Sequence, residues 1–117
     1  MPDLFDEIFG LSPDVRYVAR ERGGEATLRE RPGIAGASAA ESDKYEELLV
    51  NPTVLALIER RGRIDCGGLE YVLIRYGNFF QILHAIPGGH LSVAVEPHGD
   101  PLAVVAALRP IVTRLRA

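Results

Sequence analysis

Hydrophobic and polar residues alternate in three short runs in the second half of the chain. These runs cover residues 69–76, 79–86 and 90–96, and short turns rich in glycine and proline separate them. Alternation with a period of two is typical of strands. In the last run Leu91, Val93 and Val95 should point inward, while His90, Ser92 and Glu96 should point outward or towards a polar site.

An amphipathic run follows the third strand and predicts a C-terminal helix. Asp100 is a candidate cap, and Pro101 suits the first helical position. Apolar residues recur at spacings of three and four, and we expect them to form a core stripe: Leu102, Val105, Leu108, Ile111, Val112 and Leu115. Pro110 should bend this helix.

The pattern at the start of the chain predicts a short helix and a hairpin. Asp3 can cap a helix that stops at Gly10. Residues 15–20 then alternate as a half-buried strand, and the pair Gly23-Gly24 permits a tight turn with positive φ. A weaker return strand is expected over residues 25–30.

The longest helical pattern lies in the middle of the chain, after a glycine-rich loop over residues 32–40. Ser42 can cap it, and Gly62 should close it. Pro52 interrupts the pattern, and Asn51 before it can cap a second segment. Two helices and one kinked helix are both consistent with this pattern.

This central region carries more apolar residues than one helix face needs. One stripe comprises Tyr45, Leu48, Leu49, Pro52 and Leu55, and the other comprises Val50, Val54, Leu57 and Ile58. A helix that lies on a sheet normally shows a single apolar stripe. Two stripes indicate that one faces the sheet and the other a second body, unless Pro52 rotates the second segment and merges them.

The predicted order is therefore α-β-β-α-β-β-β-α. Five antiparallel strands with helices before, between and after them define an α+β domain, in which helices cover one sheet. The 117 residues, of which 47% are hydrophobic and 25% charged, suit one domain over residues 1–117 with one core.

Composition and charge exclude several classes of function. The net charge of −3 argues against nucleic acid as a partner, because phosphate binding needs clustered basic residues. The single cysteine, Cys66, rules out an internal disulfide, and we expect it to be a partly buried residue at a strand entrance. No signal-like segment or long apolar run is present, which predicts a cytoplasmic protein with no membrane partner.

The titratable residues give no convincing catalytic or metal site. His84 and His90 could be neighbours across a hairpin, but a zinc site needs three or four ligands. Glu96, His98 and Asp100 are explained better by a polar turn and a helix cap than by acid–base chemistry. We expect no catalytic residue, no metal and no cofactor, and hence no enzyme.

The segment Leu69-Glu70-Tyr71-Val72-Leu73-Ile74-Arg75-Tyr76, followed by a turn and then by Leu91-Ser92-Val93-Ala94-Val95-Glu96-Pro97 before a helix, resembles the roadblock / dynein light chain family. The order of elements matches that family, with its profilin-like sheet, over nearly the whole chain. Pro52 and the long glycine-rich loop are departures from the family pattern.

This resemblance implies a non-enzymatic homodimer. In the family the third strand pairs with its counterpart into a ten-stranded sheet, and the central helices pack together. Pairing would also cover an apolar sheet edge. The expected interface comprises Val54, Leu57, Ile58, Leu69, Tyr71 and Leu73.

Bacterial members of the family commonly regulate small Ras-like GTPases or act as scaffolds for them. The leading hypothesis is therefore an adaptor that binds such a GTPase. Two alternatives stay open at this point. One is a small-molecule sensory module, which would need an internal cavity. The other is a metal-assisted enzyme that uses His84 and His90.

Overall fold

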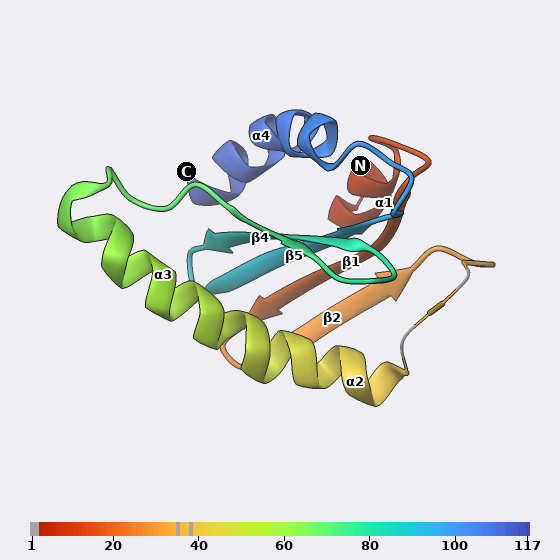
Figure 1. Cartoon of the computed structure of the whole chain (residues 1–117), viewed down its shortest axis with the longest axis horizontal. Helices are drawn as coiled ribbons and strands as arrows, with labels where there is room; N and C mark the ends of the chain where they lie inside the picture. The colour runs from red at the N-terminus through yellow and green to blue at the C-terminus, as the bar shows by residue number, and fades with distance from the viewer. Residues whose placement is uncertain (1–2, 35, 38) are drawn as a thin grey trace.

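An antiparallel sheet of five strands lies between two layers of helix in the computed structural model, which describes residues 3–34, 36–37 and 39–117 (Figure 1). The elements in chain order are α1 (Leu4–Phe9), β1 (Val15–Arg22), β2 (Glu25–Glu30), α2 (Ala40–Tyr45), the π-helix η1 (Glu46–Val50), α3 (Asn51–Asp65), β3 (Val72–Arg75), β4 (Phe80–Ile86), β5 (Gly89–Val95) and α4 (Pro101–Arg116). The predicted α+β class and order of elements are confirmed.

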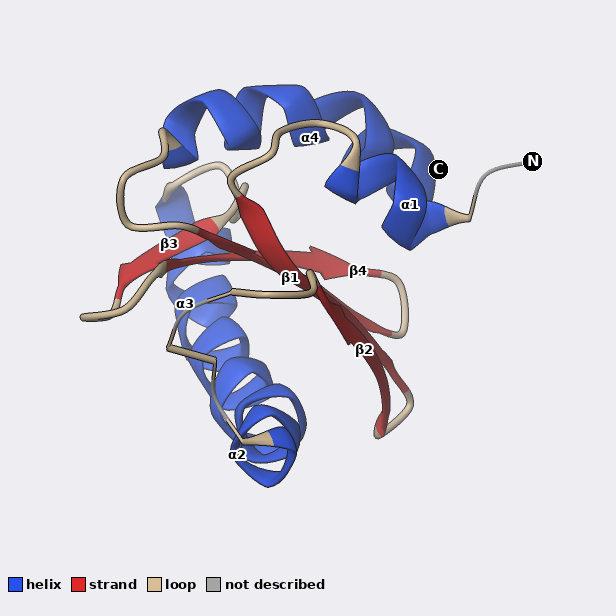
Figure 2. Ribbon diagram, turned by 90° about the vertical axis from the view of Figure 1, so that its right-hand side faces the viewer, coloured by secondary structure: helices blue, strands red, loops and turns tan. Residues whose placement is uncertain are grey.

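The strands follow the order β2-β1-β5-β4-β3, so β1 and β5 lie inside the sheet and β2 and β3 form its edges. Helices α1 and α4 cover one face, and the continuous run α2-η1-α3 crosses the other (Figure 2). Because both faces are covered, β1 is buried on both sides for most of its length. The expectation of a half-buried strand over residues 15–20 was wrong for this reason.

Glycine turns close the first and last hairpins. Gly23 and Gly24 have φ of 59° and 86°, which confirms the tight turn expected between β1 and β2. Gly88 has φ of 81° between β4 and β5. The β3–β4 turn is of a different kind, since neither Gly77 nor Asn78 has a positive φ.

An aliphatic core fills the space between the sheet and the layer of α1 and α4. Its buried members are Phe5, Ile8, Val15, Val18, Ile82, Leu91, Val93, Val95, Val104, Val105, Leu108, Ile111 and Val112. The predicted C-terminal helix is confirmed, with the Asp100 side chain accepting a hydrogen bond from the backbone N–H of Ala103. Leu102 was wrongly assigned to the core stripe, because it is 58% exposed. Pro110 lies inside α4 without ending it.

The central helix begins and ends at other residues than expected. It starts at Ala40, and no side chain caps that end, so Ser42 lies within the first turn. It continues to Asp65, well past Gly62, which is buried inside α3. A Cβ on Gly62 would lie 3.2 Å from the backbone carbon of Gly68, so this glycine permits close passage of the returning chain.

The chain between α3 and β3 also departs from the expectation. Cys66 is exposed at the C-terminus of α3 and does not lie at a strand entrance. Gly67 and Gly68 have φ of 79° and 91°, and the Gly68 N–H donates to the carbonyl of Gly62. The strand predicted over residues 69–76 is consequently confined to Val72–Arg75.

A substitution at Gly89 tests the register of β1 and β5, because a Cβ there would lie 1.8 Å from the carbonyl oxygen of Glu21. We expect Gly89→Ala to lower the free energy of unfolding by about 3 kcal/mol or more, since the clash can be relieved only by displacing backbone. Gly77→Ala is the matched control, because Gly77 has open space and no positive φ. Urea unfolding followed by circular dichroism measures both, and equal stabilities would contradict the register of β1 and β5 described here.

Candidate functional site

A buried histidine between two carboxylates lies on the sheet face under the central helix. His90 Nε2 is 2.7 Å from Glu47 Oε1, and His90 Nδ1 is 3.2 Å from Glu21 Oε1. Glu21 and His90 come from paired positions of β1 and β5, and Glu47 comes from η1. An ionised carboxylate only accepts hydrogen bonds, so both contacts are hydrogen bonds when both ring nitrogens carry protons.

Glu47 is the most connected member of this group. It is fully buried, and its Oε2 accepts a hydrogen bond of 2.7 Å from the hydroxyl of Tyr17. The side-chain amide of Asn51 donates to its Oε1 at 2.9 Å. Asn51, which was expected to cap a second helix, is thus an inward-facing residue of α3. Burial and the nearby Glu47 charge raise the pKa of Tyr17, so its hydroxyl remains a donor.

The π-helix turns two consecutive carboxylates towards the sheet. Glu46, next to Glu47, accepts a hydrogen bond of 3.0 Å from the hydroxyl of Tyr76. Burial raises the pKa of Glu46, and burial with the same hydrogen bond raises the pKa of Tyr76 to about 12. Single π-turns inside α-helices occur often at functional sites, because they re-aim side chains.

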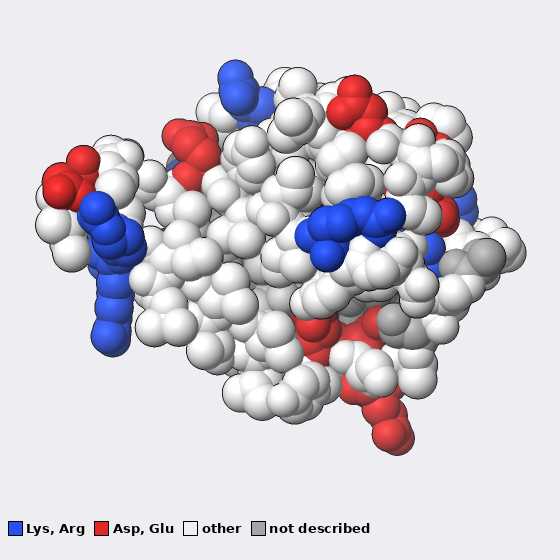
Figure 3. Space-filling model, in the orientation of Figure 1, with Lys and Arg blue, Asp and Glu red and all other residues white. Residues whose placement is uncertain are grey.

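A cavity of about 360 Å³ opens beside this π-helix, between the helix and the sheet. It is lined by Arg16, Tyr17, Glu30, Ile34, Ser42, Asp43, Glu46, Glu47, Tyr76, Gly77, Asn78, Phe79, Gln81 and Ala94. Figure 3 shows acidic side chains recessed on this side of the molecule, between the α2 end of the helix and the strands above it. Burial first, and then the charges of Glu30, Glu47 and Glu46, raise the pKa of Asp43 to about 6.

Arg16 supplies the positive charge at the cavity wall. Its guanidinium is buried, lies 3.3 Å from a carboxylate oxygen of Glu96 and donates to the carbonyl of Asn78 at 3.2 Å. It also stacks over the ring of Phe79, 5.3 Å from the ring centroid. These contacts hold the β3–β4 turn against the start of β1.

The opposite side of the central helix is an exposed apolar surface, which we call the outer helix face. It comprises Tyr45, Leu48, Leu49, Pro52, Thr53, Ala56 and Leu57. Leu57 is 64% exposed and Leu49 53%. The predicted grouping into two stripes was therefore wrong in part, because Tyr45, Leu48 and Leu49 face solvent while Leu55 of the same stripe is buried.

The residues expected at a dimer interface fall in two places. Leu57 lies on the outer helix face. Val54 and Ile58 are four residues apart on another side of α3, where Val54 is half-buried and Ile58 is 40% exposed. Leu73 lies in the edge strand β3 and is 36% exposed, whereas Leu69 and Tyr71 lie in the segment before it. Their role in an interface stays a prediction.

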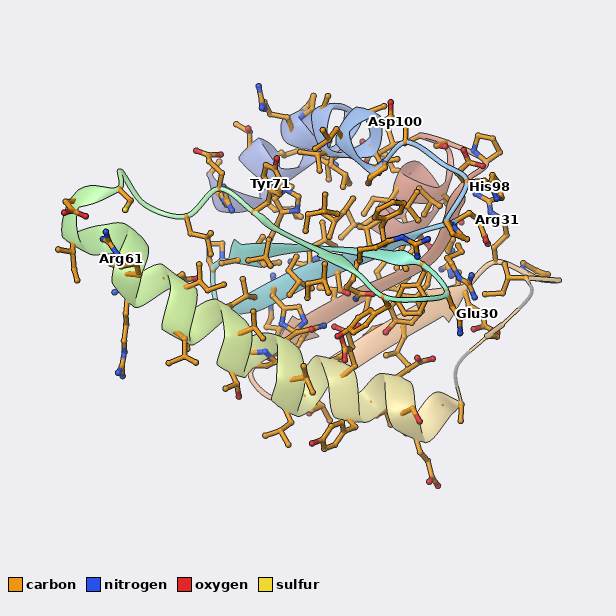
Figure 4. The ribbon with its side chains drawn as sticks, viewed as in Figure 1. Glu30, Arg31, Arg61, Tyr71, His98 and Asp100 are labelled. Carbon is orange, nitrogen blue, oxygen red and sulfur yellow. The ribbon has the colours of Figure 1, made fainter. Side chains whose placement is uncertain are left out.

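The two histidines considered as metal ligands point to opposite faces of the sheet. His84 pairs in register with Leu91, one position away from His90. Tyr71 lies beneath α4 (Figure 4), and the His84 ring contacts it. The pKa of His84 is lowered to about 4, chiefly by burial. The hypothesis of one metal held by both rings is therefore wrong. Over the described residues, no group of three or more candidate ligands converges.

Glu96, His98 and Asp100, in the turn before α4, each contact a different partner and do not form a cluster. Glu96 pairs with Arg16, and His98 Nε2 lies 3.2 Å from a carboxylate oxygen of Asp14. Asp100 caps α4, as predicted, at the far side of the turn from His98 (Figure 4).

At the other end of the molecule, Arg61 forms an exposed ion pair with Asp65 on the last turns of α3.

Comparison with known proteins identifies the fold. Neither a family model nor a curated protein matches the sequence. Among solved structures, the chain is similar to a Roadblock/LC7 domain from Streptomyces avermitilis, with TM-score 0.62, 16% identity, and coverage of 96% of this chain and 99% of that one. It is also similar to MglC from Myxococcus xanthus, with TM-score 0.61, 14% identity, and coverage of 94% and 93%. The chain therefore has the roadblock/LC7 fold, and the resemblance seen in the sequence is confirmed at that level.

The polar cluster around Glu47 and His90 was not predicted from the sequence, although the sequence contains a signal for it. Glu21, Gln81, His90 and Ser92 are polar residues in strands, and the structure buries them on one face. Glu47 and Asn51 are four residues apart, and they provide the matching face of the helix.

None of the described helices is long and apolar enough to cross a membrane.

Removing the Glu47 carboxylate should destabilise the protein strongly. We expect Glu47→Ala to cost about 3–5 kcal/mol of unfolding free energy, because His90, Tyr17 and Asn51 would lose their buried acceptor. Glu41→Ala is the control on the exposed side of α2 and should change stability by less than about 0.5 kcal/mol. Equal urea midpoints for the two variants would show that this network contributes little.

Proposed function

We propose that this protein is a non-enzymatic homodimeric adaptor that regulates or scaffolds a small Ras-like GTPase. The observation that carries this proposal is the outer helix face, where Leu48, Leu49 and Leu57 are exposed together on one side of a helix. Large contiguous apolar patches on soluble domains are typical of interaction sites. The roadblock/LC7 fold supports the proposal, because the family resemblance implies a dimer whose central helices meet.

The open sheet edge offers the second half of the interface. β3 has a strand neighbour on one side only, and it carries the exposed Leu73. Unpaired edge strands with apolar side chains tend to associate with another strand. Pairing of β3 with its copy would extend the sheet across two protomers and bring the two outer helix faces close together. The single-domain chain over residues 1–117 is the proposed protomer.

Dimerisation is tested by sedimentation of the purified chain. We expect about twice the chain mass of 12.8 kDa at tens of micromolar. Leu57→Glu should raise the dimer dissociation constant at least about thirtyfold, because it places a charge in an apolar contact where truncation alone typically costs about 2 kcal/mol. Leu102→Glu is the matched control, since Leu102 is 58% exposed on the other helical layer. A monodisperse monomer of the unaltered chain would contradict the proposal.

The partner is tested separately. We expect immobilised full-length chain to retain a Ras-like GTPase from a lysate, identified by mass spectrometry. The purified GTPase should then bind directly in either its GDP-bound or GTP-bound form. Leu57→Glu should weaken this binding together with dimerisation, because the proposed adaptor acts as a dimer. Failure of the purified GTPase to bind in either nucleotide state would contradict the adaptor role. It would not contradict the proposed dimer, which sedimentation tests.

A further inference from the structure

The cavity beside the π-helix is not explained by dimerisation, because it lies on the inner side of the central helix. Its volume of about 360 Å³ falls in the range of small-molecule sites. One wall carries the aromatic rings of Tyr17, Tyr76 and Phe79. Such rings bind an apolar body and also attract a cation placed over their faces.

One carboxylate in the cavity lining has no partner in the described part of the chain. The Asp43 side chain forms no hydrogen bond or ion pair there. Its neighbours are already engaged, because Glu46 accepts a hydrogen bond from Tyr76 and the amide nitrogen of Gln81 donates to the hydroxyl of Ser92. A cation that donates hydrogen bonds would supply the partner that Asp43 lacks.

The charge of the lining points the same way. Among the described residues, Glu30, Asp43, Glu46 and Glu47 line the cavity, and Arg16 is the one cation in the lining. The Arg16 guanidinium is already engaged by Glu96 and by the carbonyl of Asn78. Like charges held this close destabilise one another, and a bound cation relieves that repulsion. Because no three candidate ligands converge among the described residues, an organic cation fits better than a metal ion.

We propose that this cavity binds a primary ammonium ion carried on a small apolar body. The ammonium group donates to Asp43 and Glu46, and the apolar body packs on the rings of Tyr17, Tyr76 and Phe79. Three N–H donors on one nitrogen suit several acceptors that surround a small volume. The protein then serves as a small-molecule receptor in addition to its proposed role as an adaptor.

The test uses the full-length chain and a matched pair of probes, 2-phenylethylammonium and 2-phenylethanol, which differ in charge but little in size. Binding is followed by titration of ¹⁵N-labelled protein, with the amides of Gly77, Phe79 and Ala94 as reporters of the cavity. We expect the ammonium ion to bind at least about tenfold more tightly than the alcohol, because only it forms charge-assisted hydrogen bonds.

Two variants separate a built site from general attraction to an acidic surface. Asp43→Asn should weaken binding of the ammonium ion about tenfold and leave the alcohol unchanged. Glu41→Gln removes an exposed acid from the same helix and should change neither. Between pH 5 and pH 7 the affinity for the ammonium ion should rise, because Asp43 loses its proton near pH 6 in the field of Glu30, Glu46, Glu47 and Arg16.

Three results would overturn the proposal. The first is equal affinity for the two probes, and the second is a loss on Glu41→Gln as large as that on Asp43→Asn. The third is displacement of the ammonium ion by millimolar Mg²⁺ or Ca²⁺, which would assign the acids to a metal. None of these measurements depends on the oligomeric state, so they leave the adaptor proposal untouched.

Discussion

The buried Glu47 carboxylate determines how the central helix faces the sheet. Its oxygens accept hydrogen bonds from His90, Tyr17 and Asn51, and leaving such a group without partners costs several kcal/mol. The helix must therefore direct Glu47 and Asn51 inward. Leu48 and Leu49, the next residues along the helix, are consequently turned towards solvent. The exposed apolar surface is thus a consequence of a buried polar contact.

The π-turn at residues 46–50 makes this orientation compatible with Pro52. A proline lacks the N–H of a normal helical hydrogen bond, and its ring crowds the carbonyl four residues earlier. A wider turn just before it relieves that crowding, and the N–H of Asn51 bonds to the carbonyl of Glu46. The helix therefore continues through Pro52 to Asp65 without breaking. The same wide turn brings Glu46 and Glu47 to the sheet together, which forms the acidic wall of the cavity.

The features that depend on local periodicity could be predicted from the sequence, and those that depend on a buried polar contact could not. The hairpin at Gly23 and the helix after Asp100 follow from turn chemistry and spacing, and both are confirmed. The predicted assignment of side chains to helix faces was wrong because the π-turn holds one extra residue, which rotates every later side chain. Hydropathy alone does not reveal a π-turn at Glu46. His90 was expected outside or in a polar site, and only the fold shows that Glu21 and Glu47 make that site.

The two layers of the domain consequently differ in what holds them. Helices α1 and α4 pack on an aliphatic core, whose burial stabilises the fold without regard to ligands or protonation. The α2-η1-α3 layer packs on a face that combines polar residues with a smaller apolar cluster of Tyr17, Ala19 and Ala94. Leu55 and Leu83 are buried in the same layer. Charge and hydrogen bonding therefore contribute much of the energy of that layer, which is where the proposed cation and the proposed partner would bind. Because the cavity and the outer helix face lie on opposite sides of one helix, both can be occupied at the same time.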